Sequence, residues 1–208
     1  MSLTESPVKE NAKIESSMRG SKRRKRIFEA LHDCIIEKGY AKTTLADVAR
    51  TAGMTPSHLL YYFSGKDAIL EDFFENVARR IVDRMEGFRT ETAERRIDLL
   101  VDLFFAGKGI TMSEIGFMLE CFGVAVHDTQ LHSEKTALDR FCKTYLEELF
   151  IESPCGAANA RDSAEVAYAT LIGLRTAVYF DERIGLPQAR CLFRASIMNL
   201  ANSGQLGK

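Results

Sequence analysis

The sequence contains no tryptophan, only four prolines and no long run of apolar residues. The most apolar stretch, IGFMLECFGVAV at residues 115–126, is shorter than the roughly 18 apolar residues that a membrane-spanning helix needs, and it includes Glu120. The start of the chain, MSLTESPVKENAK, is polar and has no apolar segment of the kind found in secretion signals. We therefore expect a cytoplasmic protein with no membrane partner.

Cysteine is sparse and widely spaced. The five residues are Cys34, Cys121, Cys142, Cys155 and Cys191. No Cys-x-x-Cys pair is present and no histidine lies at zinc-finger spacing from a cysteine, so we predict no metal site. We interpret the thiols as small buried apolar groups in a reducing compartment, and a redox sensor or a metal site stays the alternative.

Motifs for catalysis are also missing. The sequence has no Ser-His-Asp set, no Gly-rich phosphate loop and no carboxylate dyad in a defined motif. We therefore predict no catalytic residue and no cofactor, and we expect that the protein is not an enzyme.

The charge is unevenly distributed, although the net charge is only −1. Residues 1–66 carry 12 Lys and Arg against 7 Asp and Glu, whereas the remainder carries 16 against 22. A basic N-terminal part on an acidic body indicates that one end of the molecule meets a polyanion. Chance variation in solvated surface charge is the alternative explanation.

The stretch TTLADVARTAGMTPSHLLYYF at residues 43–63 has the pattern of two short helices joined by a tight turn. Thr44 can cap the first helix, and Asp47 three residues later can return the hydrogen bond in a capping box. Gly53 suits the turn, where glycine adopts a left-handed backbone at least cost. Thr55 can cap the second helix, followed by proline at its first position. Such a unit reads DNA through its second helix.

The remaining chain also has the apolar spacing of helices, and strand-like alternation is nowhere sustained. We predict an all-α protein with a mobile polar tail at 1–20, an N-terminal three-helix helix-turn-helix domain at 21–66 and a C-terminal helical domain at 67–208. The helices expected in this last domain run to Gly87 and then over about 91–106, 113–127, 130–152, 161–182 and 187–203, with a break at Gly107 and Gly109.

Residues 22–70 resemble the N-terminal domain of TetR-family transcriptional regulators almost from end to end. The matching features are the basic start, the Gly39-Tyr40 pair, the Ala52-Gly53 turn, Leu59 and Phe63 as anchors, and the Lys66-Asp67 pair. The resemblance implies a homodimer that binds double-stranded DNA at a near-palindromic operator. It also implies a C-terminal domain that binds a small-molecule effector and dimerises.

The DNA-contacting residues follow from the motif and from the resemblance. Ser57 and His58 lie on the first turn of the second helix, which faces base edges, so we predict that they read the sequence. The resemblance assigns Thr44, Tyr62 and Lys66 to phosphate contacts. Arg23, Arg24, Lys25 and Arg26, in the run SKRRKR, are expected to support them as an arm or as the first turn of the first helix. A solubilising helix start is the alternative for this run.

The segment VAYATLIGLRTAVYF at residues 166–180 carries a single charged side chain, Arg175. A helix that is apolar nearly all round must be buried on more than one side. Small residues on it let a second helix approach closely. We predict the dimer interface at Ala169, Gly173, Ala177 and Phe180; a core helix buried entirely within one subunit is the alternative.

Large apolar side chains on the central helices suit an apolar ligand cavity, although such residues also form ordinary cores. The predicted lining residues are Phe104, Phe117, Met118, Phe122 and Tyr145, with Glu120 as polar anchor. Glu120 can meet a ligand or form a structural ion pair with Arg140, Lys143 or Arg175.

The sequence is compatible with three functions. The favoured one is a repressor that a small apolar or amphipathic ligand releases from its operator. The second is an effector-independent DNA-binding regulator whose body only dimerises or binds a protein partner. The third is an enzyme with an incidental N-terminal domain.

Overall fold

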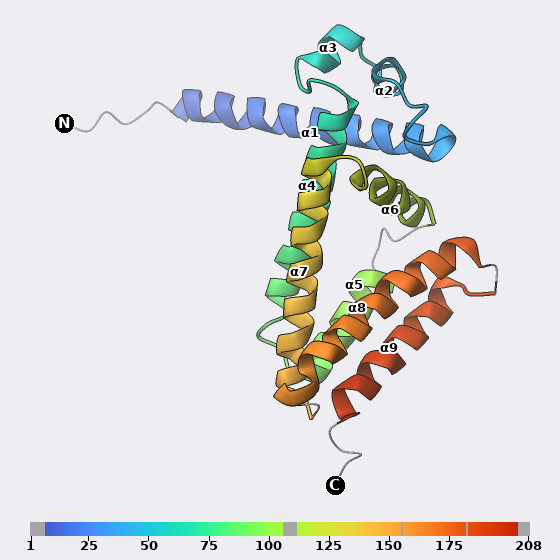
Figure 1. Cartoon of the computed structure of the whole chain (residues 1–208). Helices are drawn as coiled ribbons and strands as arrows, with labels where there is room; N and C mark the ends of the chain where they lie inside the picture. Colours follow the sequence, from blue (N-terminus) through green and yellow to red (C-terminus); the bar gives the residue numbers. More distant parts are fainter. Residues whose placement is uncertain (1–6, 106–111, 155, 182, 204–208) are drawn as a thin grey trace. The chain divides into compact units, whose positions relative to one another are not determined.

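A computed structural model describes residues 7–105, 112–154, 156–181 and 183–203, and in these ranges the chain forms helices and no strand. The predicted all-α class is confirmed. The helices are α1 Pro7–Lys38, α2 Leu45–Thr51, α3 Pro56–Leu60, α4 Lys66–Gly87, α5 Ala93–Phe105, α6 Met112–Ala125, α7 Thr129–Ile151, α8 Ala157–Phe180 and α9 Leu186–Asn202 (Figure 1). The expected break at Gly107 and Gly109 lies outside the described residues. None of the helices in the described ranges combines the length and apolarity needed to cross a membrane.

The chain divides into two compact units, residues 1–73 and 74–208, so the division falls inside α4 rather than at the expected position after residue 66. The first two turns of α4 belong to the N-terminal unit because they pack on α1. The ring of Phe73 lies 5.4 Å from that of Phe28, centroid to centroid, and Arg24 forms an ion pair with Asp72.

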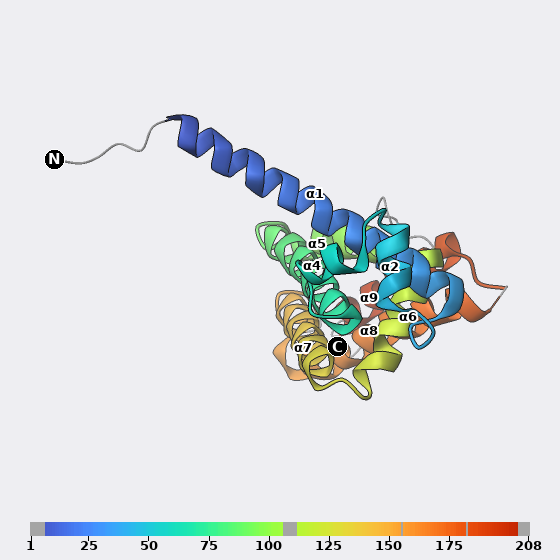
Figure 2. The ribbon, with the colours of Figure 1, turned by 90° about the horizontal axis from the view of Figure 1, so that it is seen from above.

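Helix α1 is longer than the sequence predicted. Residues 7–20, expected to form part of a mobile tail, are helical in the structure, and that expectation is wrong for them. Proline at the first helical position favours helix initiation, and no further proline interrupts the run before Gly39, whose φ of 79° ends it. In two views the N-terminal half of α1 projects beyond α2 and α3 (Figures 1 and 2).

The core of the N-terminal unit is formed where α1, α2 and α3 cross. Ile27, Leu31 and Ile35 recur along one face of α1 and are fully buried. Val48 of α2 and Leu59 of α3 are also fully buried, which fixes both short helices. Short helices of this length are not stable alone, so this packing determines where the second helix of the motif lies.

The C-terminal unit is a helical bundle in which α8 packs against both α7 and α9, and α5 packs against α9. Phe105 of α5 and Phe193 of α9 lie 5.2 Å apart, centroid to centroid, within one buried apolar cluster. Leu149 and Phe150 of α7 belong to the same cluster. Helices α8 and α9 pack against each other and lie side by side (Figure 1).

The cysteines are buried, as predicted, at Cys34, Cys121 and Cys142, but the prediction is wrong for Cys191, which is exposed. On α9 the buried positions include Ala189 and Phe193, and residue 191 points away from both. Burial raises the pKa of the Cys121 and Cys142 thiols to about 12, so both stay protonated at neutral pH. Cys155 lies outside the described residues.

Candidate functional site

The N-terminus of α2 is fixed by the predicted capping box. The Asp47 backbone N–H donates to Thr44 Oγ1 at 3.2 Å, and the Thr44 backbone N–H donates to Asp47 Oδ2 at 3.0 Å. Lys38, at the end of α1, lies 2.5 Å from the same carboxylate. Its ammonium, with the Thr44 hydroxyl and N–H, holds the pKa of Asp47 well below its usual range, so this carboxylate stays ionised.

The turn between α2 and α3 has the predicted glycine geometry. Gly53 has a φ of +65°, and a Cβ atom there would lie 2.8 Å from Arg26 Nη2. Thr55 caps α3 by accepting the His58 backbone N–H at 3.2 Å, and Pro56 is the first helical residue. The helix-turn-helix read from the sequence is therefore confirmed, residue by residue, in this segment.

Helix α3 has one exposed face. Ser57 and His58, the predicted base-reading residues, are exposed, whereas the next residue, Leu59, is buried. Leu60 and Tyr61 at the C-terminal end are also exposed, with 51% and 83% of their surface accessible. Small polar, imidazole and apolar groups are therefore accessible to solvent on this helix.

The basic run at residues 21–26 lies in the middle of α1, so the expectation of an arm or of a first helical turn is wrong. Its side chains pair within the N-terminal unit. Arg24 Nη1 lies 2.7 Å from Asp72 Oδ2, and Lys25 Nζ lies 3.8 Å from Glu29 one turn later. Lys25 is the most loosely held of these groups because its side chain and that of Glu29 are both largely exposed.

Arg23 reaches from α1 to α3 and to the turn that follows it. Its Nη1 atom lies 3.0 Å from His58 Nε2 and donates to Tyr62 Oη at 3.3 Å. The rings of His58 and Tyr62 lie 5.6 Å apart, centroid to centroid. Three residues predicted separately as DNA contacts thus form one cluster, a connection that the sequence pattern did not reveal.

Lys66, predicted to touch a phosphate, also holds the turn before α2. Its ammonium donates to the backbone carbonyls of Tyr40 and Thr43 at 2.9 and 3.0 Å and lies 4.2 Å from the centroid of the Tyr40 ring. The Tyr40 hydroxyl donates to Asp67. An ammonium has three N–H groups, so these two carbonyls account for two of them, and the phosphate contact stays a prediction. The Gly39-Tyr40 and Lys66-Asp67 pairs were both noted in the sequence, but their contact was not.

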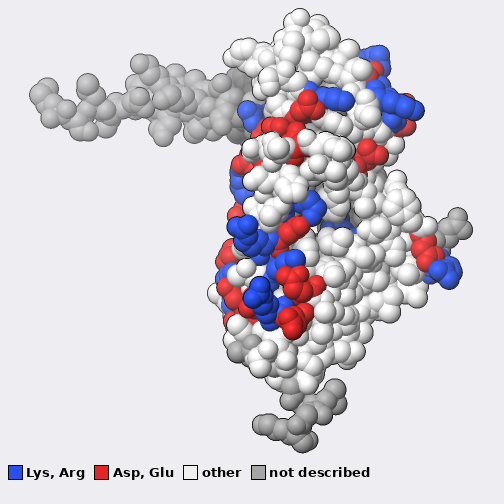
Figure 3. Space-filling model, in the orientation of Figure 1, with Lys and Arg blue, Asp and Glu red and all other residues white. Residues whose placement is uncertain are grey.

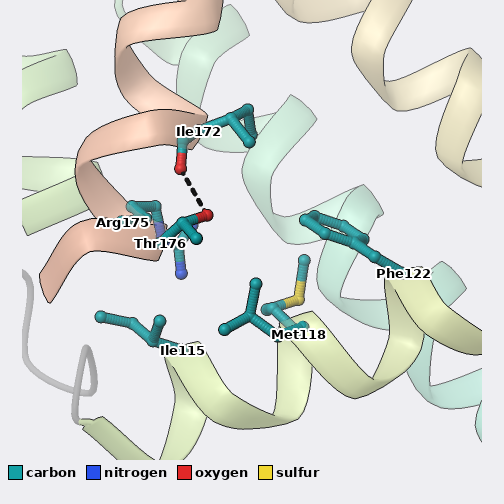
Figure 4. Close-up of a pocket in the computed structure, with 7 residues that line it drawn as sticks. Ile115, Met118, Phe122, Ile172, Arg175 and Thr176 are labelled. Atoms are coloured by element: carbon teal, nitrogen blue, oxygen red, sulfur yellow. Dashed lines mark hydrogen bonds between the residues drawn. The ribbon is translucent and has the colours of Figure 1, made fainter. Parts of the chain in front are cut away.

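Two of the six predicted ligand-lining residues meet at a cavity between α6 and α8. Met118 and Phe122 line it from α6, and Arg175 and Thr176 face them from α8 (Figure 4). The remaining lining residues are Ile115, Leu119 and Ile172. The cavity measures about 20 Å³, which is room for one water molecule.

The other predicted lining residues lie elsewhere. Phe104 and Phe117 are buried, and Tyr145 is fully buried, where its hydroxyl accepts from Arg96 Nε at 3.1 Å. Glu120 is exposed and does not line this cavity, so its role as polar anchor stays a prediction. At 100° per residue, position 120 points away from the side of α6 that Met118 presents to the cavity.

The predicted dimer residues lie on an exposed apolar stripe of α8. Ala169, Gly173 and Phe180 are exposed and Ala177 is partly exposed, whereas Leu171 and others on the opposite side are buried. A Cβ atom built on Gly173 would meet no described atom within 4 Å. On the face seen in Figure 3, a broad area over α8 and α9 shows no charged side chains apart from a group at its edge. The helix is therefore buried on one side only within the single chain.

Comparison with known proteins agrees with this description. The family model of bacterial regulatory proteins of the tetR family matches residues 27–73. Over 137 residues the chain is 23% identical to the HTH-type transcriptional regulator BetI of Escherichia coli, covering 64% of this chain and 70% of that protein. It is 28% identical over 127 residues to BetI 1 of Chromohalobacter salexigens, covering 57% and 60%.

Solved structures share the fold. A transcriptional regulator from Rhodococcus superposes with a TM-score of 0.75 at 18% identity, covering 86% of this chain and 96% of that one. A transcriptional regulator from Saccharomonospora viridis, solved in complex with choline, gives a TM-score of 0.73 at 20% identity, with the same coverage. A TetR transcription regulator from Haloarcula marismortui gives 0.74 at 19% identity, covering 88% and 98%.

Proposed function

Because the chain belongs to the TetR family and is a DNA-binding transcriptional regulator, we propose that it is a cytoplasmic repressor that binds a near-palindromic operator as a homodimer and is released by a small molecule. The observation that carries the proposal is the complete helix-turn-helix, capped at Thr44 and Thr55 and turned at Gly53, with an exposed reading face. Selection from a randomised DNA library tests it. We expect half-sites about one helical turn apart, or a simple multiple of that spacing.

Within this proposal the DNA contacts divide into two roles. Ser57 and His58 read bases, while Thr44, Tyr62 and Lys66 hold phosphates. Lys66→Ala is expected to weaken binding to all sequences alike and to reduce the slope of log affinity against log salt by about one unit. Ser57→Ala is expected to change base preference. Equal losses for both variants on every sequence would contradict the division.

The apolar stripe of α8 supports dimerisation. Ala177→Glu would place an unpaired carboxylate between two packed helices, so we expect monomers, or insoluble protein, and loss of operator binding. Glu165→Ala is the matched control. It lies on the same helix and removes the carboxylate that pairs with Lys143. A soluble dimeric Ala177→Glu protein that still binds the operator would move the interface elsewhere. Sedimentation velocity distinguishes the two results.

An effector would enter between α6 and α8. The cavity beside Met118 and Phe122 holds only a water, so a ligand binds there only by selecting a state in which the two helices separate. The choline complex of the Saccharomonospora protein supports the idea that this fold accommodates a small molecule. By linkage, operator DNA must lower the affinity of the protein for the ligand by the same factor by which the ligand lowers its affinity for DNA, commonly about 5- to 150-fold. Titrating a hydrophobic compound library against the operator complex tests this step.

The small volume of the cavity between α6 and α8 argues against an effector at that place, and in this respect it favours the second function, an effector-independent regulator. Two results together would favour the effector-independent regulator. No compound in the library perturbs operator binding, and Met118→Trp, which fills the cavity, leaves operator affinity unchanged. Turnover of any bound compound would instead favour the third function, an enzyme. We expect none, because regulators of this family act by binding.

A further inference from the structure

Arg23 is placed to act on the reading helix rather than on DNA alone. It lies on α1, 35 residues before His58, yet one guanidinium nitrogen contacts both His58 Nε2 and Tyr62 Oη. Its neighbour Arg24 forms an ion pair with Asp72 on α4, so this part of α1 also contacts α4 within the N-terminal unit. The cluster therefore joins a residue expected to read bases and a residue expected to hold phosphate.

The chemistry of these contacts has a fixed direction. A guanidinium carries only N–H donors, so His58 Nε2 must accept, and the imidazole proton must reside on Nδ1. Tyr62 Oη likewise accepts, so its O–H hydrogen stays available to another group. Arg23 thus occupies an acceptor on each partner and leaves each with a donor.

DNA presents many acceptors to such donors. Phosphate oxygens accept, as do purine N7, guanine O6 and thymine O4, whereas the exocyclic group of cytosine in the major groove is a donor. We infer that Arg23 is a positioning residue that sets His58 as a hydrogen-bond donor and thereby makes the operator exclude cytosine at the base that His58 meets. This inference rests on the proposed DNA-binding function.

The chain offers a matched control for the charge. Lys25 lies two residues later on α1, carries the same charge and pairs only with Glu29 on its own helix among the contacts of the described residues. Arg23→Met and Lys25→Met each remove one positive charge near the DNA, but only the first removes the donor from His58 and Tyr62. Arg23→Lys keeps both the charge and an N–H donor.

The first measurement is base preference, by selection from a randomised half-site library at fixed salt. We expect the wild type and Lys25→Met to disfavour cytosine at one position of each half-site, with Lys25→Met weaker on all sequences alike. Arg23→Met should lose about tenfold of the discrimination at that position, the scale of one base contact. Arg23→Lys should restore it.

The second measurement is the tautomer of His58, by ¹⁵N NMR of the imidazole in the free protein. We expect the Nδ1–H form in the wild type and Lys25→Met, and a mixture in Arg23→Met. Identical base profiles and identical tautomers for the two methionine variants would overturn the inference. If the wild type selects no sequence, the proposed function fails instead, and the tautomer still decides whether Arg23 positions His58. Thermal melting of each variant verifies folding.

Discussion

Replacing Arg96 by methionine tests whether Tyr145 is a structural partner rather than a ligand contact. Arg96 is a fully buried arginine on α5, and its Nε donates to the Tyr145 hydroxyl at 3.1 Å while its Nη1 lies 2.7 Å from Glu152. Its third nitrogen, Nη2, is buried and has no hydrogen-bond partner within the described residues. The guanidinium carbon also lies 4.7 Å from the centroid of the Tyr145 ring.

These contacts set the expected loss. The hydrogen bond from a charged donor to a buried hydroxyl contributes about 1.5–3 kcal/mol. The ion pair with Glu152 adds little, because that carboxylate is 56% exposed. Removing the unpartnered buried Nη2 offsets part of the loss. We expect Arg96→Met to lower the free energy of unfolding by about 1–2 kcal/mol, and Tyr145→Phe by about 2 kcal/mol, since it leaves a buried N–H of a cation unpaired.

The double variant is the decisive measurement. Because each single change orphans the other partner, Arg96→Met/Tyr145→Phe should lose about 2 kcal/mol less than the sum of the singles in denaturant unfolding. Arg95→Met, on the exposed side of the same helix, is the control and should change nothing measurable. Strictly additive losses, or a Tyr145→Phe variant of unchanged stability that no longer responds to an effector, would refute the reasoning.

Three further predictions address the N-terminal unit and the thiols. Gly53→Ala should destabilise the helix-turn-helix by about 1–2 kcal/mol, because alanine disfavours a positive φ, and hydrogen exchange of α2 and α3 should report it. Asp47→Asn should destabilise the protein at pH 7. The difference in the free energy of unfolding between the variant and the wild type should shrink as the pH falls from 5 toward 2. The pKa of Asp47 is depressed in the folded protein, so its stabilisation is present above the usual carboxyl pKa and is lost as the wild-type carboxylate is protonated. Iodoacetamide should label Cys191 in the native protein far faster than the buried thiols, as peptide mass spectrometry can measure.

The sequence was sufficient for features that depend on neighbouring residues. The capping box of Thr44 and Asp47, the left-handed turn at Gly53 and the cap at Thr55 follow from bonds that span three residues or fewer. Such signals are written in the local order of the chain, so the helix-turn-helix and the all-α class could be predicted. The division of roles within its DNA contacts remains a prediction.

The tertiary structure decided which distant groups meet. Arg23 beside His58, and Lys66 on the carbonyls of Tyr40 and Thr43, join residues more than 20 positions apart, and no local pattern specifies such pairs. The length of α1 was not predicted either. A polar composition indicates a mobile segment, even where no residue in it breaks a helix.

The body shows the same limit in a second form. The apolar composition of α6 and α8 predicted that both are at least partly buried, but an error of one residue in helical phase turns a side chain by 100°. Packing against α8 selected Met118 and Phe122 for the cavity and left Glu120 exposed, and it brought Arg175 to the cavity in place of the expected carboxylate. The sequence alone determined most of the helical segments and the helix-turn-helix at residues 43–63, because local hydrogen bonds encode both; only the packing of helices decided which side chains share a site.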